Sequence, residues 1–337
     1  MPFRDVIGHR RLVGLLARSI HRQSLPPSLI FAGSSGVGKR LTATAVAQTL
    51  NCLTPRLAAD DEVDACGLCA ACTRIARGVH PDVLVIEPGD NGSIKIEQIR
   101  DAVERTGYRP FEGRRRVVII DDADALVVAA QNALLKTLEE PPSLSMFILV
   151  TSRPDVLLPT VRSRCVHLRF RPLAAREIAE ALVTRGHSET EARAVAATAD
   201  GSLGRALETS AGELVEAREV ARLVLGRAAS TTDPRTRIDA AKDLLSKTGA
   251  GGASDRDQLA SHLRAMESLL RDVELLSADG DAEALANPDV RLALEGLTKT
   301  YAGMRGLRAF TAVEQARMAL ERNAGVKIVA DWLVLQL

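Results

Sequence analysis

The sequence predicts an α/β domain built on a parallel sheet, followed by two helical domains. Up to about residue 170, short apolar runs alternate with segments of helical periodicity, a pattern typical of a parallel sheet covered by helices. After Arg171 and Pro172 the strand-like runs stop. The chain has 337 residues, of which 46% are hydrophobic and 26% charged, so it suits two or three globular domains and not a disordered segment.

Four apolar runs are the expected central strands of the first domain, which we place at residues 1–172. They are apolar at every position, as strands buried on both faces are, and they span 29–31, 83–86, 117–120 and 146–150. Helical periodicity marks the segments between them, at 38–51, 94–106 and 129–139.

The remaining chain predicts helices only. Residues 173–211 predict a small helical domain, with helices near 174–185 and 188–199 and a turn at Asp200-Gly201-Ser202. Residues 212–337 predict a larger helical domain with three interruptions, at 249–254, at Asp279-Gly280 and at Asn287-Pro288.

One apolar stripe in the last domain recurs with a helical period. It could dock a partner helix, but a place in the domain's own core is the more common role of such a stripe. Its members are Leu263, Met266, Leu269, Leu270 and Val273.

Composition and charge narrow the functional classes. The net charge is +1, so contact with nucleic acid would need a local basic patch. The obvious one is Arg114-Arg115-Arg116, for which a solvated turn is favoured over a phosphate contact. The N-terminus has no apolar signal region, and no run approaches the ~18 apolar residues of a membrane helix, so we expect a cytoplasmic protein.

Residues 33–40 have the pattern of a phosphate-binding loop. Gly33, Gly36 and Gly38, with Val37 between them, would let backbone N–H groups point at phosphate oxygens, and the following helix adds its dipole. Lys39 would reach the β and γ phosphates. The alternative is a glycine-rich turn that only joins a strand to a helix.

The residue after the lysine departs from that pattern. Ser or Thr normally binds Mg²⁺ there, and this chain has Arg40. Thr42 and Thr44 lie farther along the helix and are poor substitutes. We therefore expect a site that can bind ATP or ADP but that is poorly suited to Mg²⁺-assisted hydrolysis.

Two later strand ends add to this candidate site. Asp121 ends the 117–120 run and could hold Mg²⁺ through water, although a solvated strand end is the alternative. Asp122 follows it where a Glu would orient the attacking water, and its shorter side chain would place the carboxylate about an ångström short. Thr151 ends the 146–150 run, where a polar group would sense the γ-phosphate.

Four cysteines predict a structural zinc site. Cys66, Cys69 and Cys72 have CxxCxxC spacing, and Cys52 supplies a fourth thiolate, which completes a closed tetrahedral site. Unbound thiols are the alternative. Cys165 is remote, and we expect it to be buried as a small apolar residue.

Together these pieces resemble the bacterial clamp-loader ATPases of DNA polymerase III, an AAA+ family. The clearest stretch is Gln131-Asn-Ala-Leu-Leu-Lys-Thr-Leu-Glu-Glu-Pro-Pro142, and Ser163-Arg164-Cys165 also matches. The resemblance covers about residues 3–210. It implies that 173–211 is a lid domain and that the helical remainder, including Leu320-Glu-Arg-Asn323 and Lys327, is a collar domain.

The departures from the family's gamma/tau motor subunits all concern ATP chemistry. The motors have Thr and Glu where this chain has Arg40 and Asp122. After Gly-Ser-Leu in the lid the motors have Arg, whereas this chain has Gly204, and its Arg205 is displaced by one residue. Arg164 is retained. That pattern resembles the family's delta prime subunits, and a chain of 337 residues also disfavours a long tau form.

The resemblance implies a role in a hetero-pentamer with gamma/tau and delta subunits. Arg164 would then reach ATP on the adjacent motor subunit, because a guanidinium is a planar, permanent cation suited to a γ-phosphate. The complex would load the sliding clamp on primer–template DNA. Two other functions stay open: an active clamp-loader ATPase, and an unrelated phosphate-loop enzyme or zinc-containing remodelling protein.

Overall fold

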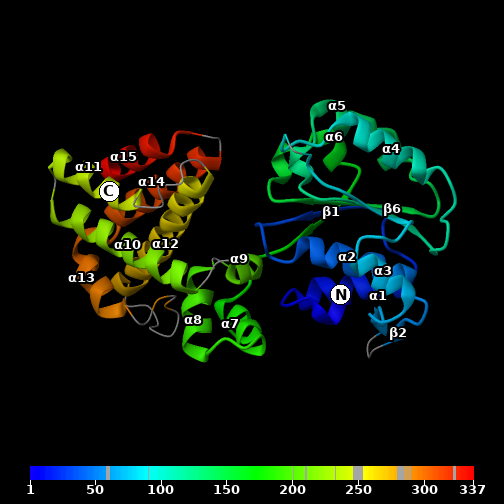
Figure 1. Cartoon of the computed structure of the whole chain (residues 1–337), viewed down its shortest axis with the longest axis horizontal. Helices are drawn as coiled ribbons and strands as arrows, with labels where there is room; N and C mark the ends of the chain where they lie inside the picture. Colours follow the sequence, from blue (N-terminus) through cyan, green and yellow to red (C-terminus); the bar gives the residue numbers. More distant parts are fainter. Residues whose placement is uncertain are drawn as a thin grey trace. The chain divides into compact units, whose positions relative to one another are not determined.

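The chain forms two compact units, Met1–Leu173 and Ala174–Leu337, each with its own core (Figure 1). The computed structural model describes residues 1–57, 61–89, 91–199, 201–208, 211–231, 233–245, 253–278, 285, 287, 290–321 and 324–337.

A five-stranded parallel sheet forms the centre of the first unit. In spatial order its strands are β4 (Val83–Ile86), β5 (Arg116–Ile120), β6 (Ser145–Thr151), β1 (Ser28–Ala32) and β7 (Val166–Arg169). Each neighbouring pair is parallel, with Ile30 opposite Leu149 and Ile119 opposite Ile148. The four predicted strands are confirmed, but the predicted central position is wrong for β4, which lies at one edge of the sheet and is only partly buried, and β7 is an additional strand at the other edge.

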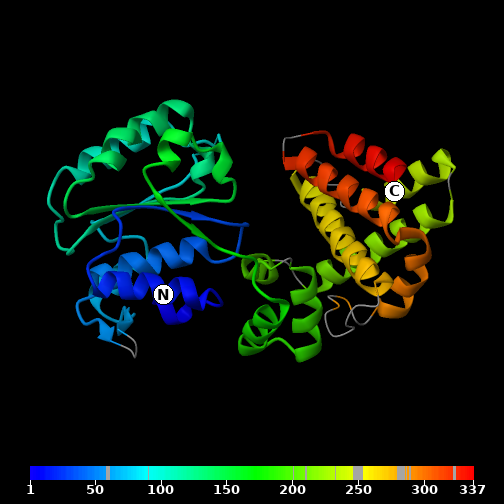
Figure 2. The ribbon, with the colours of Figure 1, turned by 180° about the vertical axis from the view of Figure 1, so that it is seen from behind.

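Helices cover both faces of this sheet (Figures 1 and 2). One face carries α1 (Arg10–His21), α2 (Lys39–Asn51) and α3 (Ala70–Ala76), and the other carries α4 (Ile96–Thr106), α5 (Val128–Glu139) and α6 (Pro159–Arg162). Short 3-10 turns lie at Phe3–Asp5, Ala123–Ala125 and Pro154–Val156.

Two hydrophobic cores explain why the central strands are apolar at every position. Successive side chains of a strand point to opposite faces. In β1, Phe31 packs with the α1–α2 core while Ile30 packs with the α4–α5 core. In β5, Ile119 packs with the α1–α2 core and Ile120 with the α4–α5 core. All four of these side chains are at most 1% exposed. Each such side chain contributes about 1.5–3 kcal/mol to folding.

A small insertion lies between α2 and α3. Its strands β2 (Arg56–Leu57) and β3 (Val63–Asp64) are antiparallel, and Cys66 and Cys69 lie between β3 and α3. The carboxylate of Asp64 accepts a hydrogen bond from the Phe3 N–H at 2.7 Å and pairs with Arg4 at 3.1 Å. The N-terminal segment therefore anchors the insertion.

The arginine run is divided between the surface and the interior, which corrects its interpretation as one loop. Arg116 is the first residue of β5, is buried, and pairs with the buried Asp82 at 2.8 Å. The expected surface role is therefore wrong for Arg116, and it remains a prediction only for Arg114 and Arg115.

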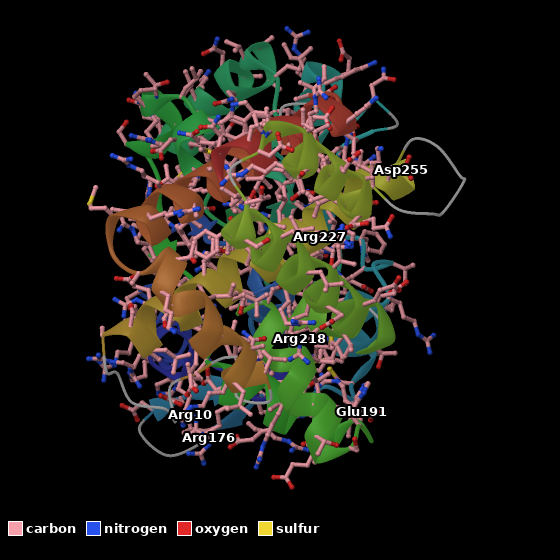
Figure 3. The ribbon with its side chains drawn as sticks, turned by 90° about the vertical axis from the view of Figure 1, so that its left-hand side faces the viewer. Arg10, Arg176, Glu191, Arg218, Arg227 and Asp255 are labelled. Atoms are coloured by element: carbon pink, nitrogen blue, oxygen red, sulfur yellow. The ribbon has the colours of Figure 1, made fainter. Side chains whose placement is uncertain are left out.

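The second unit consists of helices in its described residues. They are α7 (Ala175–Thr184), α8 (Glu189–Thr198), α9 (Leu203–Glu208), α10 (Ala211–Ser230), α11 (Pro234–Leu244), α12 (Ala253–Ser277), α13 (Arg291–Tyr301), α14 (Met304–Glu321) and α15 (Val326–Gln336). The apolar stripe of α12 is at most 3% exposed and lies in the core with α10, α14 and α15, so its assignment to the core is confirmed. Figure 3 shows Arg218 and Arg227 on α10.

Local signals place several of these helix starts. The Ser188 hydroxyl accepts a hydrogen bond from the Glu191 N–H at 3.3 Å and caps α8. The Asp233 carboxylate accepts one from the Thr236 N–H at 3.1 Å, with Pro234 at the first position of α11.

Several predicted interruptions lie outside the described residues. These are Asp200, residues 249–252, Asp279-Gly280 and Pro288, together with the 322–323 part of the collar motif. Within the described residues, no helix is long and apolar enough to span a membrane.

Candidate phosphate-binding site and metal site

The predicted phosphate-binding loop lies at the carboxyl end of β1, between β1 and α2. In the sheet, β1 lies between β6 and β7, and the order of the strands changes direction at this position. Open α/β sheets bind their ligands at such switch points, outside the carboxyl ends of the strands. The topology therefore places residues 33–40 where a ligand is expected.

Two glycines of the loop are required by the geometry. A Cβ on Gly33 would lie 2.3 Å from the carbonyl oxygen of Phe170, so no larger residue fits without movement of the backbone. Gly38 precedes the first residue of α2 with φ of 97°, a left-handed conformation that favours glycine. The loop thus turns directly into a helix whose first N–H groups have no partner within the helix.

Lys39 is folded back onto the loop. It is 7% exposed, and its Nζ donates to the carbonyl oxygens of Gly33 at 2.7 Å and Ser34 at 2.6 Å. Burial lowers the pKa of Lys39, while the neighbouring Asp121 and other carboxylates oppose that shift. The cation therefore lies in the centre of the loop, where a phosphate would compete with the two carbonyls.

Arg40 reaches the ends of two neighbouring strands. Its Nη1 lies 2.9 Å from Asp121 Oδ2, after β5, and it also pairs with Glu87, after β4. Burial opposes the charged form, but hydrogen bonds and charges from Glu87 and Asp121 outweigh it and raise the pKa of Arg40. The expected Mg²⁺ carboxylate is thus paired with a guanidinium.

The residues present do not fit Mg²⁺, which requires octahedral oxygen ligands. Position 40 supplies no oxygen. The hydroxyl of Thr42 donates to the Gly38 carbonyl at 2.9 Å, and that of Thr44 donates to the Arg40 carbonyl at 3.0 Å. Both threonines are therefore engaged with their own helix, as the sequence predicted for poor substitutes.

The neighbouring carboxylates have other roles. Asp122 has φ of 47°, and burial together with Asp121 and Asp124 raises its pKa. Thr151 is fully buried, and its hydroxyl donates to Asp124 at 2.8 Å. Its carbonyl accepts the Gly33 N–H at 3.2 Å, so Thr151 adjoins the loop while its side chain is held by Asp124.

Arg164 lies away from this loop, beyond the end of α6. Its Nε and Nη2 donate to Glu139 Oε2 at 3.1 and 2.8 Å, and its Nη1 donates to the Thr160 carbonyl at 3.1 Å. The two side chains of this ion pair are 31% and 60% exposed. Exposed pairs of this kind contribute at most about 1 kcal/mol, so the guanidinium can exchange Glu139 for another anion.

The four predicted cysteine ligands come together at the insertion. The sulfurs of Cys52, Cys66, Cys69 and Cys72 all lie within 4.8 Å of one another. A tetrahedral zinc site with Zn–S bonds of about 2.3 Å needs sulfurs about 3.8 Å apart. The cysteines are thus positioned to bind a metal ion, and four thiolates leave no open position. Cys52 ends α2 and Cys72 lies in α3, so the cluster ties these helices together.

Hydrogen bonds favour the thiolate of Cys66, whereas burial raises the pKa of Cys52 and of Cys72 in the same cluster. A hydrogen bond from Thr54 and the N–H groups of Leu68 and Cys69 lower the pKa of Cys66 to about 5. Cys165, in contrast, is buried among apolar side chains of the α4–α5 core, and burial raises its pKa to about 12. Its predicted apolar role is confirmed.

Sequence reasoning missed the partners of the predicted residues. Glu87 directly follows the apolar run 83–86, so its strand-end position could have indicated a place beside Asp121. Glu139 lies within the stretch that carried the family resemblance. Asp124 had no comparable signal, because it binds Thr151 across a distance of 27 residues.

The parallel sheet and the glycine-rich loop at its switch point define an α/β protein of the type that binds ligands beside that loop. Residues 8–174 match the model of a family described as "DNA polymerase III, delta subunit". Residues 8–174, just under half of the chain, therefore belong to this family of DNA polymerase III subunits.

Relatives with two different names are similar to the chain. DNA polymerase III subunit delta' of Pseudomonas aeruginosa is 42% identical over 40% of this chain and 40% of its own length. Subunit delta' of Bacillus subtilis is 36% identical over 55% of this chain and 54% of its own. Subunit tau of Salmonella typhimurium is 35% identical over 61% of this chain and 32% of its own.

The similarity therefore covers only part of this chain and only part of each relative, and the chain spans about a third to about half of the length of these relatives. A solved gamma subunit-related protein of Thermotoga maritima covers 96% of this chain and 97% of its own, at 17% identity and a TM-score of 0.40. That likeness is too distant to inform function.

Proposed function

We propose that this chain is the delta prime subunit of a DNA polymerase III clamp loader and that it activates ATP bound to a neighbouring gamma/tau subunit. Arg164 would supply the positive charge in trans, and the chain itself would hydrolyse ATP slowly or not at all. The observation that supports the proposal most strongly is the pairing of Arg40 with Asp121, because it places a guanidinium at the position where a motor subunit would bind Mg²⁺.

The surroundings of Arg164 support the second half of this proposal. Its present side-chain partner, Glu139, is exposed and uses one oxygen, since both hydrogen bonds that Glu139 accepts from the guanidinium end on Oε2. A γ-phosphate offers more charge and more acceptor oxygens to the same fork. The Arg164 guanidinium can therefore exchange Glu139 for a phosphate at a small cost in free energy.

The remaining parts of the chain have supporting roles in this proposal. Residues 173–211 form the lid domain, in which Gly204 and Arg205 lie on α9, and residues 212–337 form the collar that joins the pentamer. A structural zinc ion at the four cysteines stabilises the insertion of the 1–172 domain. The partners are gamma/tau and delta subunits, the sliding clamp and primer–template DNA, and the compartment is the cytoplasm.

The second candidate function is an active gamma/tau-type ATPase. It is supported by the similarity to subunit tau and by Gly33, Lys39 and Asp121, which keep their places beside the loop. In this case nucleotide would bind to residues 33–40 and be hydrolysed there. Arg40 and Asp122 are the residues that disfavour it.

Association and hydrolysis with purified partners test the proposal. The chain is mixed with a gamma/tau subunit and a delta subunit, and the assembly is measured by native mass spectrometry and by ATP turnover with and without this chain. We expect a stable hetero-oligomer whose turnover rises when the chain is added. Failure to assemble would refute the proposal, and fast hydrolysis by the isolated chain would favour the motor alternative.

A further inference from the structure

The carboxylates beside the loop are already neutralised by a side chain of the same protein. Asp121 and Glu87 are adjacent, because β4 and β5 pair in register and the Asp121 N–H donates to the Ile86 carbonyl at 2.9 Å. Arg40 contacts both carboxylates through a single nitrogen, Nη1. A metal ion at this point would have to displace that nitrogen.

The same side chain remains available to a ligand. Arg40 carries five N–H donors on a planar fork, both carboxylates use one nitrogen, and the side chain is 51% exposed. Its backbone lies in the first turn of α2, next to Lys39. Two cations therefore stand at the start of a helix whose dipole already favours an anion.

We propose that the 33–40 loop binds a nucleoside di- or triphosphate without magnesium, with the Arg40 guanidinium in the position of the metal. The inference rests on the nucleotide binding that the sequence of this loop predicts, and it goes beyond the proposed function by adding the form of the ligand. A guanidinium satisfies phosphate oxygens and carboxylates by hydrogen bonds, whereas Mg²⁺ needs oxygen ligands that position 40 does not supply.

Calorimetric titration of the isolated full chain with ADP and with ATP tests this directly. Each nucleotide is titrated in excess Mg²⁺ and in EDTA. For the unmodified chain we expect dissociation constants that agree within about threefold between the two conditions. Arg40→Thr restores the hydroxyl and removes the cation, so its binding should weaken about tenfold or more in EDTA relative to Mg²⁺.

Two control variants locate the effect. Arg176→Thr makes the same change on α7, where Arg176 pairs with Glu180 and its side chain is 88% exposed (Figure 3). It should behave as the unmodified chain. Lys39→Ala should abolish binding in both conditions, which places the nucleotide at the loop.

Mn²⁺ gives a second readout that does not depend on affinity alone. With the nucleotide present, the electron paramagnetic resonance spectrum should show protein-bound Mn²⁺ with Arg40→Thr and not with the unmodified chain. The inference is overturned if the unmodified chain loses about tenfold or more affinity in EDTA, binds no nucleotide, or matches Arg40→Thr in both assays. These assays do not involve Arg164, so their failure would leave the proposed action in trans standing.

Discussion

Asp82 is the most heavily bonded buried carboxylate among those described in the first unit, and its replacement by Asn should cost much of the stability. The carboxylate is fully buried and accepts hydrogen bonds from the N–H groups of Phe111, Glu112 and Gly113 at 2.7–2.9 Å. It also pairs with Arg116 at 2.8 Å. It therefore fixes the loop that precedes β5.

The pKa of Asp82 gives the magnitude of its contribution to stability. Burial raises the pKa of Asp82, but the three N–H groups and Arg116 outweigh it and lower the value from 3.8 to about 2. At 1.36 kcal/mol for each unit, the charged form contributes about 2–3 kcal/mol to folding near neutral pH. Asp82→Asn also leaves the Arg116 charge buried and unpaired, so a loss of about 3–5 kcal/mol is expected.

The assay is urea unfolding of Asp82→Asn and the unmodified chain from pH 7 down to pH 3. Because the folded-state pKa is depressed, the contribution is complete above pH about 4 and is lost as the pH falls toward 2. The difference between the two proteins should therefore shrink at the acid end. Asp101→Asn is the matched control, because Asp101 is 64% exposed in a surface pair and should cost less than about 0.5 kcal/mol. A cost at Asp82 below about 1 kcal/mol, or one that is constant with pH, would refute the reasoning.

Two further substitutions test the cysteine cluster and the loop. Cys72→Ser should remove one equivalent of bound zinc, measured by atomic emission on purified protein, while Cys165→Ala should retain the metal because Cys165 lies outside the cluster. Equal zinc content in the two variants would contradict the assignment. Gly33→Ala should destabilise the chain by about 1–3 kcal/mol in thermal unfolding, because its Cβ would lie 2.3 Å from the Phe170 oxygen. The control is Gly226→Ala in α10, where the new Cβ meets open space. An unchanged stability of Gly33→Ala would show that the backbone moves enough to accommodate the Cβ.

The central strands and the cysteine site could be predicted because their signals are local. Runs such as 117–120 are apolar throughout since both faces of the sheet are covered, and CxxC spacing by itself brings two sulfurs together. β7 was not predictable in this way. It is an edge strand with mostly exposed side chains, so it lacks an apolar run.

The missed contacts are long-range, which explains why the sequence did not indicate them. Arg116 belongs to a basic run by sequence, but its partner Asp82 lies 34 residues away, and only the pairing of β4 with β5 brings the two together. Arg40 was recognised as a departure from the motif. Its pairing with Glu87, 47 residues away, turned that departure into a specific arrangement of charges.

ATP hydrolysis by the complex reconstituted with gamma/tau, delta, sliding clamp and primed DNA tests the central claim most directly. The rate is compared for Arg164→Ala and Lys39→Ala in this chain. We predict that Arg164→Ala slows hydrolysis at the adjoining gamma/tau site by about a thousandfold, while Lys39→Ala leaves turnover near normal. A harmless Arg164→Ala with a damaging Lys39→Ala would contradict the account and identify the chain as a motor.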